Sequence, residues 1–180
     1  MKWFPFAILA VIGIVCQTTL VPLIRLDWFE SGRIGPDWMF ILAVYYALWG
    51  PWPDAAMAAW ILGFVLDLFT LQTGGRVGLH AFCYGAAAWG IIRVRHVVIR
   101  SHPIAQFLIA LVFATGIEVA TLLYRCWSVP GPGPYVAWHA GLLSAVYTSI
   151  CTPPLLWILT RLTWLTGLRP ESRPIRHRRT

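Results

Sequence analysis

The chain has 180 residues, of which 58% are hydrophobic and only 12% are charged, and it contains eleven tryptophans. About a quarter of the residues of a soluble domain are usually charged, so this composition excludes an ordinary soluble fold and predicts an all-α, polytopic membrane protein. The net charge of +7 would suggest a nucleic-acid partner in a soluble protein, but here the positions of the charges matter more than their sum.

Six apolar runs are expected to form one transmembrane domain over residues 1–160. They cover about residues 3–24, 36–49, 55–71, 78–92, 104–124 and 137–159. The first run carries no charge between Lys2 and Arg25, and at about 1.5 Å per residue it is long enough for a hydrocarbon layer of about 30 Å. A cleaved signal peptide is the rival interpretation, but no small-residue cleavage site follows, so we expect an uncleaved anchor.

The second and third runs are short for membrane spans. Pro36 and Asp37 open the second run: proline suits the first helical turn, and an acid complements the positive end of the helix dipole. The run stops at the segment Gly50 to Pro53, and the third run follows at once. We therefore expect a tight hairpin, which either crosses the membrane twice or dips into it as a re-entrant pair.

Basic residues predict the orientation. With both termini in the cytoplasm, ten of the 14 lysines and arginines lie on that side: one at the N-terminus, three after the fourth run and six from Arg161 onward. The other four lie outside, which satisfies the positive-inside rule. Residues 161–180 then form a basic cytoplasmic tail. We expect the following arginines to fix the topology and to contact anionic lipid: Arg93, Arg95, Arg100, Arg173, Arg176, Arg178 and Arg179.

With this topology, the unusual polar residues fall in the outer half of the membrane: Asp37, Asp67, His80 and Glu118. An acid at the centre of a membrane span costs about 2.5–3.5 kcal/mol and is usually turned inward and paired. For Asp67 and Glu118, structural contacts between helices and a binding role are equally favoured, and both are favoured over proton transfer. His80 is favoured as a residue at a helix start rather than as a ligand.

Two stripes of small residues indicate how Asp67 is buried. Ala55, Ala59, Gly63 and Asp67 recur at every fourth position of the third run, and Gly78, Ala81, Gly85 and Ala88 recur at steps of three and four in the next. Small stripes let membrane helices approach closely. We hypothesise that these two faces pack together and bury Asp67 against Arg76, His80 or Arg125.

No catalytic constellation is present in the sequence: no nucleophile has a neighbouring base, and there is no zinc-protease motif or phosphate-binding glycine loop. The four cysteines are far apart and lie in or beside apolar runs, where cysteine is a small hydrophobe. The sequence therefore predicts no enzyme activity, no metal site and no cofactor.

Three motifs, in this order and spacing, resemble the MreD family of bacterial rod shape-determining proteins: Pro36-Asp37-Trp38, then Gly63-Phe-Val-Leu-Asp67-Leu, then Gly78-Leu79-His80-Ala81-Phe82. That family has Pro-Asp or Pro-Asn opening its second helix, Gly-x-x-x-Asp-Leu on the next, and Gly-Leu/Val-x-Ala-Leu at the start of the one after. The resemblance covers about residues 36–90 in motif and nearly the whole chain in length, hydropathy and charge layout.

The resemblance implies a non-enzymatic, multi-pass protein of the bacterial inner membrane that takes part in the elongation complex and regulates cell shape and peptidoglycan synthesis. Family members work with the bitopic protein MreC and, through it, with the actin-like MreB and the wall synthases. The family is similar in fold to the substrate-binding subunits of energy-coupling-factor transporters, which implies a compact six-helix bundle.

That similarity also supplies an alternative function, a vitamin-transporter subunit that holds a small molecule in an outer pocket near Asp67 and Glu118. A third class, an ion or proton channel, needs a continuous polar stripe along one helix, and none of the runs has one.

Overall fold

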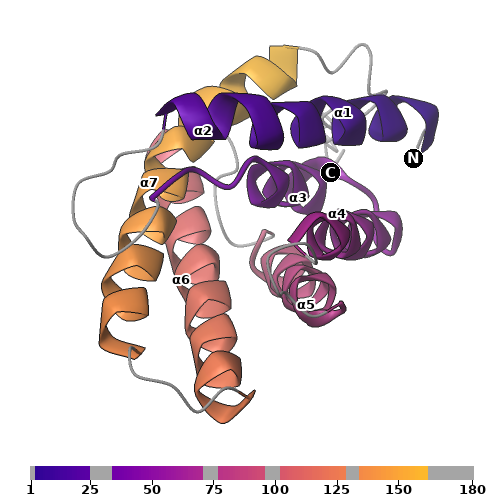
Figure 1. Cartoon of the computed structure of the whole chain (residues 1–180). Coiled ribbons are helices and arrows are strands. Elements are labelled where there is room, and N and C mark those ends of the chain that lie inside the picture. The colour runs from indigo at the N-terminus through magenta and orange to yellow at the C-terminus, as the bar shows by residue number, and fades with distance from the viewer. Residues whose placement is uncertain (1–2, 25–33, 71–76, 96–101, 129–133, 162–180) are drawn as a thin grey trace, which may run out of the picture.

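The computed structural model describes residues 3–24, 34–70, 77–95, 102–128 and 134–161, and most of these residues lie in helices (Figure 1). Each of the six predicted runs contains a helix, so the all-α prediction is confirmed. The elements are α1 (Trp3–Val15), a π-helical segment η1 (Cys16–Leu20), α2 (Val21–Ile24), α3 (Trp38–Trp49), α4 (Asp54–Thr70), α5 (Leu79–Val94), α6 (Pro103–Ser128) and α7 (Pro134–Arg161).

Within the described ranges, three helical stretches are long and apolar enough to cross a membrane, which indicates a helical membrane protein. They are Trp3–Ile24, Pro103–Tyr124 and Trp138–Arg161. The other three helices, α3, α4 and α5, have 12, 17 and 16 residues. At about 1.5 Å per residue they extend about 18–26 Å, which is less than the hydrocarbon thickness of about 30 Å.

Helix α3 lies at the centre of the molecule. Every side chain from Met39 to Leu48 is buried, and α1, α4, α5, α6 and α7 all contact this helix. Figure 1 shows α3 between α1 and α4. A helix that is apolar on all sides has no face suited to water and is expected in an interior. The other helices are therefore arranged around α3.

Helix α1 packs one face on α3. Phe6, Ala10 and Gly13 are its buried residues, and their spacing of four and three places them on one side of the helix. A Cβ atom on Gly13 would lie 2.6 Å from Cδ1 of Leu42, so glycine permits this close approach. The opposite face exposes large apolar side chains suited to lipid, which include Phe4, Ile8, Val11 and Ile12.

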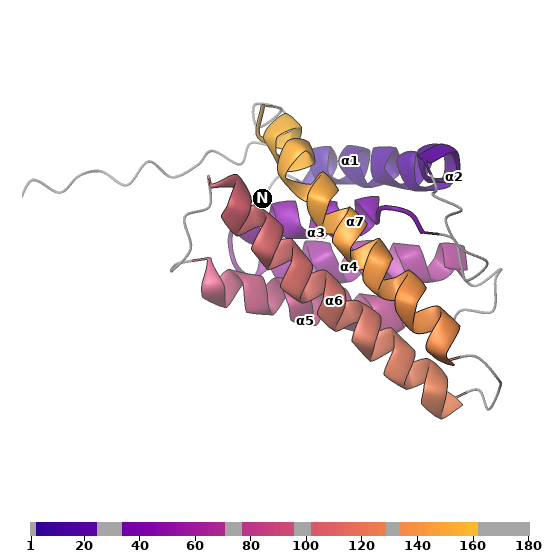
Figure 2. The same cartoon turned by 90° about the vertical axis from the view of Figure 1, so that its left-hand side faces the viewer.

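Helices α6 and α7 form a hairpin that crosses the other helices obliquely (Figure 2). Small residues allow the contacts: a Cβ atom on Gly141 of α7 would lie 2.9 Å from Oε2 of Glu118, and one on Gly90 of α5 would lie 2.6 Å from Cε1 of Phe113. The hairpin contacts α5 through α6, and it contacts α3 through both of its helices.

Successive helices run in alternating directions, so their termini gather at two ends of the molecule (Figure 2). At the first, α2, α4 and α6 end and α3, α5 and α7 begin. We call it the carboxylate end, after Asp37 and Asp67. At the second, α3, α5 and α7 end, and we call it the arginine end, after Arg93, Arg95 and Arg161. The helix directions thus bring Asp37, Asp67 and His80 to one end, as the sequence predicted.

Candidate functional site

The Asp67 carboxylate holds the start of α5. It is fully buried and accepts backbone hydrogen bonds from Gly78 to Oδ2 at 2.8 Å, from His80 to Oδ1 at 3.2 Å and from Ala81 to Oδ2 at 3.1 Å. The first turn of a helix has N–H groups without partners in the helix itself, and its positive end favours an anion. Asp67 therefore acts as an N-terminal cap supplied by the preceding helix.

The His80 ring completes this arrangement. Its Nδ1 lies 2.7 Å from Oδ1 of Asp67, and about a quarter of the His80 side chain is exposed. The contact is a hydrogen bond whose donor depends on the tautomer of the ring; a ring that carries its proton on Nδ1 donates it to Asp67. Of the partners predicted for Asp67, His80 is confirmed. Arg76 lies outside the described residues, and so does the side chain of Arg125.

The predicted contact between the two small-residue stripes is also confirmed. A Cβ atom on Gly63 would lie 2.4 Å from the His80 carbonyl oxygen and 2.7 Å from Cα of Ala81. Ala55 and Ala59 are fully buried. Backbone therefore meets backbone where α4 and α5 cross, one turn from Asp67. We call Gly63, Asp67, Gly78, His80 and Ala81 the α4–α5 clasp.

The start of α3 is held by side chains from three parts of the chain. Oδ1 of Asp37 accepts from the Phe40 N–H at 3.1 Å, Oε1 of Gln17 accepts from the Trp38 N–H at 2.9 Å, and Oγ1 of Thr148 accepts from the Asp37 N–H at 3.0 Å. Asp37 is thus the N-cap of a helix that begins at Trp38. The expectation that Pro36 occupies the first turn is wrong, because Pro36 precedes the cap.

Tyr84 of α5 lies between the clasp and the start of α3. Its hydroxyl donates to Oδ2 of Asp37, and its ring makes edge contacts with His80 and with Phe40, at centroid distances of 6.3 and 5.8 Å. Asp37 and Asp67 therefore belong to one continuous set of contacts, although each carboxylate caps a different helix.

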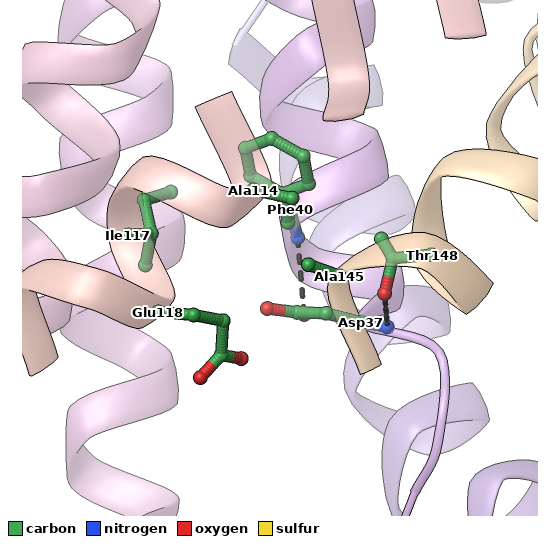
Figure 3. A pocket seen from close by; sticks show the side chains of 7 residues that line it. All are labelled: Asp37, Phe40, Ala114, Ile117, Glu118, Ala145 and Thr148. Atoms are coloured by element: carbon green, nitrogen blue, oxygen red, sulfur yellow. Dashed lines mark hydrogen bonds between the residues drawn. The ribbon is translucent and has the colours of Figure 1, made fainter. Parts of the chain in front are cut away.

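A small cavity lies beside the Asp37 side chain, where the start of α3 faces α6 and α7. Its volume is about 20 Å³, and it is lined by Asp37, Phe40, Ala114, Ile117, Glu118, Ala145 and Thr148. Figure 3 shows the Asp37 carboxylate directed from the start of α3 toward the side of α6 that carries Glu118. The cavity has room for about one water molecule. Sites for drug-sized or cofactor-sized ligands usually measure about 300–1,000 Å³, so this cavity does not fit a vitamin.

The predicted basic residues divide into three groups. Nη1 of Arg95 donates to the carbonyls of Ala47 and Gly50 at 3.1 and 2.6 Å, so Arg95 is turned inward onto the end of α3. Arg93 is exposed, with its guanidinium carbon 5.1 Å from the centre of the Trp89 ring. The rest of the predicted set lies outside the described residues: Arg100, Arg173, Arg176, Arg178 and Arg179.

The described residues contain no group of three or more His, Cys, Asp or Glu side chains that could hold a metal ion.

The packing residues predicted on α5 lie against α4. Ala81 is buried in the clasp, and an ideal Cβ atom on Gly85 would lie 3.5 Å from the Trp60 ring of α4. What these residues offer chemically is hydrogen bonding within the protein, between carboxylates and helix starts.

The sequence pattern did not indicate the contacts of Gln17, Tyr84 and Thr148 or the inward position of Arg95. A polar residue in an apolar run was the available signal for Gln17 and Thr148, since such residues are usually turned inward. Their partners lie 21 and 111 residues away, and no local pattern connects them.

Comparison of the chain with protein-family models, with curated proteins and with solved structures gives no match.

Proposed function

We propose that this protein is a non-enzymatic scaffold of the bacterial elongation complex, similar in role to MreD, which binds MreC and thereby links MreB to peptidoglycan synthesis. In this proposal it lies in the inner membrane with six crossings and with both termini in the cytoplasm. The basic residues of the arginine end then face the cytoplasm, in keeping with the positive-inside rule.

The α4–α5 clasp is the observation on which the proposal rests. The second and third motifs that resemble MreD lie on separate helices, yet Gly63 and Asp67 of one contact Gly78, His80 and Ala81 of the other. The first motif joins them through the hydrogen bond from Tyr84 to Asp37. The residues of the three motifs therefore contact one another, directly or through Tyr84, and these contacts hold α3, α4 and α5 together.

The contacts of Asp67 favour a scaffold over a carrier. A carboxylate that binds a solute needs a free oxygen directed into a pocket, whereas both oxygens of Asp67 accept hydrogen bonds from α5. The cavity beside Asp37 and Glu118, at about 20 Å³, holds about one water molecule. These observations support a rigid body that presents surfaces to partner proteins.

Depletion and co-purification in the host bacterium test this proposal. Depletion is expected to turn rod-shaped cells into spheres, and the tagged protein is expected to retain MreC when purified from membranes. Retention of a small metabolite without MreC, or unchanged cell shape on depletion, would contradict the scaffold role.

Two matched glycine substitutions connect the function to the clasp. Gly63→Ala places a methyl group against the His80 carbonyl, whereas nothing lies within 4 Å of a Cβ atom at Gly116. We expect Gly63→Ala to lower MreC retention and rod shape at equal membrane abundance, and Gly116→Ala to preserve both. Equal retention of MreC by the two variants would mean that the close packing of the clasp is not needed for MreC binding.

A further inference from the structure

Two arginines at the arginine end are stacked on exposed tryptophans. The guanidinium carbon of Arg93 lies 5.1 Å from the Trp89 ring centre, and that of Arg161 lies 5.1 Å from the Trp157 ring centre. In each pair the tryptophan precedes the arginine by four residues, which places both on one helix face. Trp89 and Trp157 are 53% and 61% exposed. The same arrangement therefore occurs independently on α5 and α7.

Both pairs lie in the last turns of their helices, and these two helices end at the same end of the molecule (Figure 2). Arg161 is also the last residue of the apolar stretch Trp138–Arg161 that is long enough to cross a membrane. The end of such a span is expected near the headgroup region, the level at which tryptophans gather. The Arg93–Trp89 pair lies at the same end of the molecule, on the shorter helix α5.

The chemistry of these pairs fits a phosphate group. A guanidinium held over an indole ring keeps the donors at its edge available, and this planar fork suits the oxygens of a phosphate. In the part of the chain that the structure describes, neither Arg93 nor Arg161 has a carboxylate within salt-bridge distance. Arg95 differs, because its guanidinium is used on the end of α3.

Exposed aliphatic neighbours favour a lipid over a free anion. Val94 follows Arg93 and is 41% exposed, and Ile158 follows Trp157 and is 48% exposed. A phospholipid satisfies both parts of such a surface at once, with its phosphate on the guanidinium and its acyl chains along the indole and aliphatic side chains. We propose that the Arg93–Trp89 and Arg161–Trp157 pairs bind the headgroups of anionic phospholipids at the arginine end.

The test compares lipid binding by the full-length protein in detergent with that of the Arg93→Gln/Arg161→Gln double variant. Binding of phosphatidylglycerol and phosphatidylcholine is measured by native mass spectrometry and by the rise in thermal unfolding midpoint. We expect the apparent affinity for phosphatidylglycerol to fall about fivefold for each arginine removed. The thermal unfolding midpoint measured with phosphatidylcholine should be the same for the variant and the wild type. The basic residues from 169 onward are the same in all variants and contribute a constant background.

Two controls make the result specific. Arg93→Lys/Arg161→Lys keeps the charge but removes the planar fork, so it should retain part of the preference for phosphatidylglycerol. Trp127→Leu removes an indole that is 92% exposed near the end of α6, at the opposite end of the molecule, and should change nothing. Equal loss in the Trp127 variant, no loss in the glutamine variant, or the same stabilisation by inorganic phosphate alone would each overturn the proposal.

Discussion

The two ends of the central helix α3 are stabilised in different ways. At its start, side chains from its own cap, from η1 and from α7 accept its N–H groups. At its end, the Arg95 guanidinium donates to the carbonyls of Ala47 and Gly50. Helix termini inside a membrane protein need internal partners, because lipid provides none. Among the residues that the structure describes, three side chains therefore hold the start of α3, and the Arg95 side chain holds its end.

The start of α5 resembles the end of α3, because one charged side chain, Asp67, accepts hydrogen bonds from three of its backbone N–H groups. Helix ends held by one charged side chain should be more sensitive to substitution than the start of α3. Substitutions of Asp67, Arg95 and Thr148 test this difference.

Asp67→Ala is expected to be the most destabilising change. It leaves the N–H groups at the start of α5 and the His80 ring without their hydrogen-bond partner, at a carboxylate that is itself fully buried. Removal of one partner from such a buried charged contact costs about 3–5 kcal/mol. Thermal unfolding in detergent, followed by tryptophan fluorescence, should show a much lower midpoint.

Asp67→Asn is the matched control for that change. Its amide oxygen can still accept from the start of α5, but it provides one acceptor atom where the carboxylate provides two. An intermediate midpoint is expected. If alanine and asparagine behaved like the wild type, the clasp would not be what joins α4 to α5.

Arg95→Met should have the next largest effect. Methionine keeps much of the aliphatic stem and removes both hydrogen bonds to the end of α3. Because both bonds come from the one Nη1 atom of a half-buried guanidinium, we expect a total loss of about 1.5–3 kcal/mol. Hydrogen exchange at the end of α3 should rise together with a lower unfolding midpoint. Arg93→Met, two residues earlier on an exposed side chain, should leave both measurements near the wild-type values.

Thr148→Val should have the smallest effect of the three. Valine has nearly the same shape, and one hydrogen bond from the Asp37 N–H is lost, at a cost of about 1 kcal/mol. Gln17 and the Asp37 side chain still hold the next N–H groups of α3. Thr160→Val is the control, because its hydroxyl bonds within α7, to the Trp157 carbonyl. If Thr148→Val lowered stability as much as Arg95→Met does, the three side chains at the start of α3 would not be stabilising it jointly.

The pairing of Asp67 with His80 could be predicted because the two residues lie only 13 positions apart, at the facing ends of consecutive helices. When two helices are joined by a short connection, their neighbouring ends meet whatever the rest of the fold does. The spacing of Gly63 and Asp67 then places both residues on the face that meets α5.

The sequence by itself determined the helical segments, their boundaries to within a few residues, and the inward turn of the acid on α4, because these depend on hydrophobicity and spacing along one or two helices. Only the tertiary structure decided that α3 is the enclosed helix, that Tyr84 reaches Asp37 and that Arg95 reaches Ala47, across 47 and 48 residues of sequence. Such contacts follow from the way five helices enclose a sixth, and that packing depends on all of their surfaces together.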